Sequence, residues 1–206
     1  MKNLQRFLIT AVVSISLIAI LSGTAAFGKQ QTDSFIYLAA LDPICGVIPC
    51  PDVAFSSTGE RIAIFDGIGV LTVNPKEIVF GFGNFSATAL VEGGDPVSGT
   101  WAAGELLSFK SYGPGNPDNS VNFGFPAGAL QAGRAQIRIQ LFGDDGTFLA
   151  DAILEVNCLI PGAKVPRAAI EGVHVRVQDG LNFNDADPGG TLFIQCPTGL
   201  MPAFPC

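Results

Sequence analysis

The sequence predicts an all-β protein, and more specifically an antiparallel β-sandwich of Ig-like or jelly-roll-like type with about eight to ten strands. Three observations predict this fold. Apolar and polar residues alternate with a period of two in several segments, and turn residues separate these segments at intervals of about 8 to 12 residues. Glycine and proline are also plentiful, at 25 and 14 residues, and a helical period is hard to find.

The clearest alternation lies in two segments. Residues 134–142 (RAQIRIQLF) place Ile137 and Ile139 on the face opposite Arg138, and residues 172–178 (GVHVRVQ) place three valines opposite His174. Both are expected to be half-buried strands with one face on the core and one in water. Residues 121–125 (VNFGF) show the same pattern over a shorter length. Further strands are expected at residues 61–65, 69–73, 77–82, 85–91, 106–112, 147–158 and 191–196.

Turn and loop signals separate these segments. The stretch FGDDGTF at 142–148 and the stretch FDGIG at 65–69 predict hairpin turns. The stretch SYGPGNPDNS at 111–120 is the most loop-like. The stretch LDPICGVIPCPD at 41–52 is too rich in proline to be a central strand.

The N-terminus has the features of a secretory signal peptide. Lys2 and Arg6 provide positive charge, residues 7–21 form an apolar run that is short for a membrane span of about 20 residues, and Ala26 ends a small-residue cleavage motif. Cleavage is expected after Ala26, with Gly28 as a second candidate. An uncleaved N-terminal anchor is the alternative. We therefore expect a secreted or periplasmic protein with no integral membrane segment after cleavage.

Removal of the signal peptide, residues 1–26, leaves roughly 180 residues, which suits one domain. We expect residues 27–52 to form an N-terminal segment with a Pro/Cys-rich loop and residues 53–206 to form a single sandwich domain. Cleavage leaves 9 of the 11 basic residues against 18 acidic residues, a net charge near −9. This balance argues against nucleic acid and anionic lipid as partners.

Five cysteines follow the apolar run, and export makes disulfides the expected state. Cys158 and Cys196 each continue an apolar stripe of a strand, so we expect a buried bridge between them. A second bridge is expected between Cys45 and Cys50, which leaves Cys206 unpaired. A Cys196–Cys206 bridge is the main alternative, and a bridge between two Cys206 thiols would give a dimer.

Few residues in the chain suggest catalysis. His174 is the only histidine, and its strand position predicts an outward-facing polar residue rather than a catalytic base. The G-x-S-x-G elbow, the clustered ligands of a zinc site and the phosphate-binding glycine loops are all missing from the sequence. Whether the protein is an enzyme stays open, with the balance toward a protein that is not one.

The densest Asn/Asp cluster lies between residues 178 and 190. Its oxygen-bearing side chains recur at alternate positions, as in compact calcium loops. They are Asp179, Asn182, Asn184, Asp185 and Asp187. A polar hairpin loop rich in turn residues is the favoured interpretation, and calcium is the one cofactor that the sequence leaves open.

Two features keep a carbohydrate-active protein as an alternative. Glycoside hydrolysis needs two carboxyl groups at a suitable separation. The candidate glutamates are Glu60, Glu92, Glu105, Glu155 and Glu171. Trp101, the single tryptophan, is expected to pack in the core or at an edge, and a platform for a ligand is its alternative role.

The leading expectation for function is a secreted or cell-surface, non-enzymatic module for binding, adhesion or structural assembly. It would act through its loops or through an exposed edge strand. The alternative is a carbohydrate-active protein, either a lectin-like module or a glycoside hydrolase with a glutamate pair. The sequence does not specify whether the ligand is a protein or a glycan.

Overall fold

The computed structural model describes residues 33–40, 51–122, 124–187 and 189–196. The predicted signal peptide and the residues Cys45, Cys50 and Cys206 lie outside the described residues. No helix in the described ranges has the length and apolar character that a membrane crossing requires.

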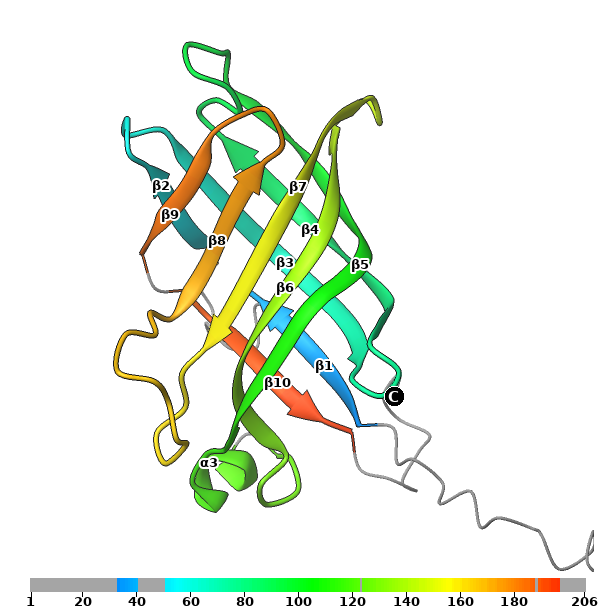
Figure 1. The fold of residues 1–206 in the computed structure, drawn as a ribbon, viewed down its shortest axis with the longest axis vertical. Coiled ribbons are helices and arrows are strands. Elements are labelled where there is room, and N and C mark those ends of the chain that lie inside the picture. Colours follow the sequence, from blue (N-terminus) through cyan, green and yellow to red (C-terminus); the bar gives the residue numbers. More distant parts are fainter. Residues whose placement is uncertain (1–32, 41–50, 123, 188, 197–206) are drawn as a thin grey trace, which may run out of the picture. The chain divides into compact units, whose positions relative to one another are not determined.

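Ten strands and one short helix make up the described part of the chain (Figure 1). The strands are β1 (Ser34–Ala39), β2 (Asp52–Ser56), β3 (Arg61–Thr72), β4 (Glu77–Ala87), β5 (Val97–Pro114), β6 (Leu130–Gly143), β7 (Phe148–Cys158), β8 (Gly172–Val177), β9 (Asn182–Asp187) and β10 (Thr191–Gln195). The helix is α3 (Pro117–Asn122).

Every strand pairing in the sheet is antiparallel, and the pairings close on themselves. Eight strands, β2 through β9, form a ring in which each pairs with the next along the chain and β9 pairs back with β2. Strands β1 and β10 pair with each other and connect β3 to β6. Each described strand therefore has a hydrogen-bonded neighbour on both sides. The exposed edge strand considered as an assembly surface is absent from the described sheet.

The all-β, antiparallel class is confirmed, whereas the sandwich is not. A sandwich consists of two sheets that pack face to face without hydrogen bonds between them. Here the backbone pairings join all ten described strands in a single sheet. Two long strands account for part of the difference, because β3 and β6 each change pairing partners along their length.

Two predicted breaks turn out to be continuous strand. The stretch 65–69, predicted as a hairpin turn, lies inside β3, where the register shifts between Phe65 and Ile68 and Asp66 has a φ of 52°. This is a β-bulge, which bends a strand without ending it. The segments predicted as separate strands at 77–82 and 85–91 are likewise joined in β4.

Two other predictions need correction. The strand predicted at 121–125 is wrong, because residues 117–122 form α3, with Pro117 first and Asp118 in the first turn, as helix starts favour. The domain boundary predicted at residue 53 excludes β1, which nevertheless lies within the sheet between β3 and β10. Its sequence FIYLA is a short continuous apolar run, which is typical of a strand covered on both faces.

The predicted disulfide between Cys158 and Cys196 is wrong. Cys158, at the end of β7, is a buried free cysteine, and burial raises the pKa of its thiol to about 12. The apolar stripe that contains Cys158 is real, but it packs into the core. The Cys45–Cys50 and Cys196–Cys206 pairings and the dimer through Cys206 depend on residues outside the described ranges, so they stay predictions.

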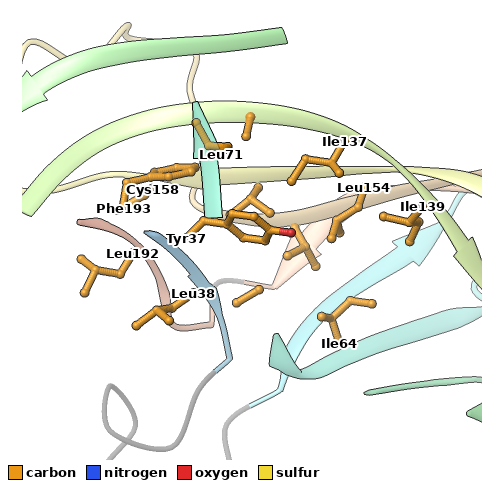
Figure 2. Close-up of a cluster of buried hydrophobic side chains, with 14 of the residues drawn as sticks. Tyr37, Leu38, Ile64, Leu71, Ile137, Ile139, Leu154, Cys158, Leu192 and Phe193 are labelled. Atoms are coloured by element: carbon orange, nitrogen blue, oxygen red, sulfur yellow. The ribbon is translucent and has the colours of Figure 1, made fainter. Parts of the chain in front are cut away.

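The core lies inside the closed sheet. Ile137, Ile139 and Val175 are all 0% exposed, which confirms the inward faces that alternation predicts for β6 and β8. Figure 2 shows Tyr37 of β1 in the middle of this cluster, among aliphatic side chains of β3, β6 and β7. A Cβ atom on Gly81 would overlap the Tyr37 hydroxyl, so a glycine is required where this ring meets β4.

Candidate functional site

The outer surface of the β5–β8 wall carries a hollow of about 600 Å³. Polar side chains from all four strands line it, and the segment 166–170 between β7 and β8 adds an apolar side. A second hollow, of about 300 Å³, lies toward β9 and is lined in part by Arg176, Asn182 and Asn184. Glu155 and His174 line both hollows. We call the two hollows together the outer groove.

Strand register explains why these polar side chains converge. Ser108 of β5, Gln136 of β6, Glu155 of β7 and His174 of β8 are cross-strand partners in one continuous row. Partners in a row point to the same face of a sheet. The chain neighbours of Gln136, Glu155 and His174 are fully buried in the core, so this row must point outward.

Glu155 is the centre of the hydrogen bonding in the groove. Its Oε2 accepts a hydrogen bond of 2.9 Å from Gln136 Nε2 and lies 3.3 Å from Arg134 Nε. Its Oε1 lies 3.5 Å from His174 Nδ1. Burial raises the pKa of Glu155, but the hydrogen bonds from His174 and Gln136 and the charge of Arg134 outweigh it, so the pKa is lowered. Glu155 is therefore a carboxylate anion at neutral pH.

Two buried polar atoms at this site have no hydrogen-bond partner among the described residues. They are His174 Nε2 and Asn157 Oδ1. Asn157 is 3% exposed and lines the larger hollow, and its Nδ2 donates to the backbone carbonyl of Ile170. A buried polar atom without a partner costs about 1–3 kcal/mol. A ligand that supplies hydrogen-bonding groups to these atoms would recover that free energy.

The outer groove is positively charged, in a chain whose formal net charge is −7. Lys110, Arg134 and Arg176 line it together with one carboxylate, that of Glu155. Among the described residues, Lys110 and Arg176 form no ion pair with an acidic side chain. The Nζ of Lys110 lies 6.0 Å from the centre of the Tyr112 ring. Two unpaired cations therefore flank the Glu155–His174 pair.

The arrangement lacks the parts of a hydrolytic site. A carboxylate beside Nδ1 of a histidine orients the ring as in a catalytic triad, but a nucleophile must then lie beside Nε2. Ser108 is three strands away in the same row, about 14 Å at the usual strand spacing, and its Oγ bonds to Gln136 Oε1. The described lining offers polar and charged groups but places no nucleophile beside His174 Nε2.

The five residues predicted to form a calcium loop do not surround a common turn. Asp179 lies in the turn after β8, with a φ of 55°, while the other four belong to strand β9. In the described part of the chain, no group of three or more His, Cys, Asp or Glu side chains is placed to hold a metal ion. The loop geometry behind the calcium prediction is therefore absent. Asn182 and Asn184 instead line the smaller hollow.

Trp101 is not a ligand platform. Its side chain is 1% exposed and packs against β3 and β4, where a Cβ atom on Gly83 would lie 2.7 Å from the indole Nε1. The ring therefore occupies the interior, and the prediction that its face meets a ligand is wrong. Core packing, the favoured prediction, is confirmed.

The candidate glutamates for glycoside hydrolysis are dispersed. Glu155 is the one acidic residue among the side chains that line the two hollows. Glu60 accepts hydrogen bonds from Ser56 and Thr58 in the β2–β3 turn, and Glu105 pairs with Arg138 at 3.1 Å. Glu171 lies just before β8 and does not line either hollow. The outer groove thus lacks a second carboxyl group for a two-acid mechanism.

Sequence reasoning missed most residues of this site. Arg134, Gln136 and Arg176 occupy the polar positions of alternating strands, which mark an outward face without marking a site. The available signal was that consecutive antiparallel strands bring such positions into rows. Comparisons with protein-family models, curated proteins and solved structures found no match to this chain. The site is therefore interpreted from its own geometry.

Proposed function

We propose that this protein is an exported, non-enzymatic binding module that holds its ligand in the outer groove. The proposal of export depends on Lys2, Arg6 and the apolar run 7–21, which lie outside the described residues. We also propose that the closed sheet packs as two facing layers, as in a sandwich. Side chains of β3 and β4 and side chains of β6, β7 and β8 contribute to one buried cluster, which supports this proposal.

One observation carries the binding proposal. The two hollows meet at Glu155 and His174, and the groove side chains around them are held by the sheet and by one another. Four consecutive strands supply the row that crosses the groove, and all four are paired on both sides. A site held in this way loses little conformational entropy when a ligand binds.

The carbohydrate-active alternative survives in its lectin-like form. A hydrolase that uses a glutamate pair would need a second carboxyl group in the groove, but Glu155 is the one acidic residue among the described lining residues. Sugar binding needs no such pair, because side-chain hydrogen bonds suffice for it.

The test is a binding and turnover screen with the full chain, exported and purified. Panels of anionic and neutral oligosaccharides and of peptides are tested by biolayer interferometry, and each ligand is analysed for cleavage by mass spectrometry. We expect a ligand that binds without being cleaved and that binds less tightly to Arg134→Ala than to the native chain. Arg61→Ala is the matched control, because Arg61 lies in β3 and lines neither hollow.

Cleavage of a bound ligand would overturn the non-enzymatic part of the proposal. Binding that is equally tight in Arg134→Ala and in the native chain would place the site elsewhere. Circular dichroism of both variants confirms that the fold is kept. Arg134 has a side chain that is 45% exposed, so its replacement leaves the core intact.

A further inference from the structure

We propose that the ligand of the outer groove is an anionic polysaccharide, whose acidic groups pair with Lys110 and Arg176 and whose hydroxyl groups bond to Asn157. This inference depends on the proposed function, because it names the ligand class of the same groove. Four properties of the groove support it: its charge, its length, its unpartnered acceptor and its paired backbone.

The positive charge of the groove favours an anionic ligand. The chain has 18 acidic residues against 11 basic ones, yet neither Lys110 nor Arg176 pairs with a described carboxylate. Their closest described charge of opposite sign in the lining is that of Glu155, which Arg134 and His174 already contact. A ligand with acidic groups would supply the missing partners for both cations.

The separation between Lys110 and Arg176 favours an extended ligand. Lys110 and Arg176 are three strands apart across the sheet and four residues apart along it. At the usual strand spacing and rise per residue, their backbones are about 19 Å apart. A polymer with repeated acidic groups can contact each side chain in the hollow that it lines, whereas a small inorganic anion would need both side chains to extend toward each other.

The unpartnered acceptor Asn157 Oδ1 favours a ligand that also donates hydrogen bonds. Asn157 Oδ1 is buried, lacks a described donor and belongs to a side chain that lines the larger hollow. A carboxylate or sulfate group cannot donate to it, but a sugar hydroxyl can. Amide and hydroxyl side chains continue along the groove at Ser108, Gln136 and Asn182. These are suitable partners for the hydroxyls of neighbouring sugar units.

The paired backbone argues against a peptide. Extended peptides usually bind by adding a strand to a sheet edge, where free backbone groups receive them. The described strands that form the groove have neighbours on both sides, so an acidic peptide would have side chains alone to bind. Polysaccharides are ordinarily bound through side chains, so this surface suits them better.

The experiment compares polymers that differ in charge but share a backbone. The full chain is immobilised, and binding is measured to polygalacturonate and to its methyl ester, and to dextran sulfate and dextran. Polyglutamate tests the acidic peptide. We expect polygalacturonate, dextran sulfate or both to bind at least about tenfold more tightly than the matched neutral polymer, and added salt to weaken the binding. The two pairs also separate carboxylate from sulfate as the preferred acidic group.

Variants locate the binding. Lys110→Gln and Arg176→Gln are each expected to weaken binding of the acidic polymer several-fold, while Arg61→Gln leaves it unchanged. Equal binding of the charged and neutral polymers, reduced by the groove variants, would overturn this inference and keep the proposed function. Polyglutamate binding at least as tight as polysaccharide binding would overturn it in favour of an acidic peptide. No binding to any acidic polysaccharide would also overturn it, and the wider ligand screen would then decide the proposed function.

Discussion

Replacing Asp52 with asparagine is expected to stabilise the protein at neutral pH but not in acid. Asp52 begins β2, and its side chain is 0% exposed. The pKa of Asp52 is raised from 3.8 to about 7, because the effects of burial and of the negative charge of Glu171 outweigh the lowering by the backbone amides of Gly189 and Ala40. The folded protein therefore holds a proton that the unfolded chain releases.

The sign and size of the effect follow from this shift. Below pH 3.8 the carboxyl is protonated in both states, so it does not change the stability. Between pH 3.8 and about 7 the unfolded chain loses the proton first, and the free energy of unfolding falls as the pH rises. A shift of about 3 pKa units corresponds to about 4 kcal/mol, which is the upper limit of the loss. An asparagine side chain cannot ionise, so Asp52→Asn avoids the loss.

Urea unfolding of the native chain and of Asp52→Asn at pH 4 and pH 8 measures the effect. We expect similar stability at pH 4, and at pH 8 an advantage for Asp52→Asn of up to about 4 kcal/mol. The control is Glu77→Gln, which replaces an exposed carboxyl of β4. Glu171 remains in Asp52→Asn, and burial raises its pKa too, so the contribution of Glu171, which has the same sign, persists in both proteins. An equal pH dependence in the native chain and Asp52→Asn would refute the reasoning.

Three further predictions test the packing of the interior. Gly81→Ala is expected to destabilise the fold by about 1–3 kcal/mol, because its Cβ would overlap the Tyr37 hydroxyl. Gly104→Ala is the control, because its Cβ would make only an ordinary contact, at 3.9 Å from the Arg138 carbonyl oxygen, and equal losses in urea unfolding would contradict the prediction. Trp101→Ala is expected to lower the free energy of unfolding in urea by about 3–5 kcal/mol and to leave the ligand affinity of the folded protein unchanged. A loss of affinity would show that Trp101 contributes to ligand binding. Cys158 is expected to resist alkylation, followed by mass spectrometry, until the protein is unfolded, and rapid labelling of the native protein would show that its thiol is accessible.

The inward faces of the long strands could be predicted because they depend on local alternation. Ile137 and Val175 are buried wherever their strands lie in the sheet, provided that one face meets the core. Strand β9 could not be predicted in the same way. Its sequence, NFNDAD, is rich in residues that favour turns, and it is extended because β2 and β8 pair with it on either side. Such long-range pairing overrides local preference.

The candidate site was harder to predict than the fold. Alternation predicts that His174 faces outward. The structure confirms this, because His174 is partly exposed while Val173 and Val175 on either side of it are buried. Its contact with Glu155 depends on the register between β7 and β8, which alternation does not specify. The alternate spacing of oxygen-bearing residues likewise predicts a turn, whereas Asn182–Asp187 forms an extended strand.

The contents of the interior explain why the ligand site should lie on the outer face. A closed sheet can hold a ligand inside when its inward side chains leave room. In this protein Tyr37 and Trp101 project inward, and both are at most 1% exposed. Glycines on β3 and β4, among them Gly69 and Gly83, remove the side chains that would otherwise collide with the two rings. Gly67 and Gly81 do the same, so these four strand glycines make room for aromatic rings in the interior.

With the interior occupied, the outer wall of β5–β9 is a surface of the described residues that combines hollows with charge. The same alternation that directs Ile137 and Val175 inward directs Gln136 and His174 outward, so the rigid core and the polar groove are two faces of the same strands. A change that shifted the register of β7 by one residue would turn Glu155 inward and expose its apolar neighbours. Folding of the core and formation of the groove are thus coupled, and a variant that keeps the native stability is expected to keep the groove.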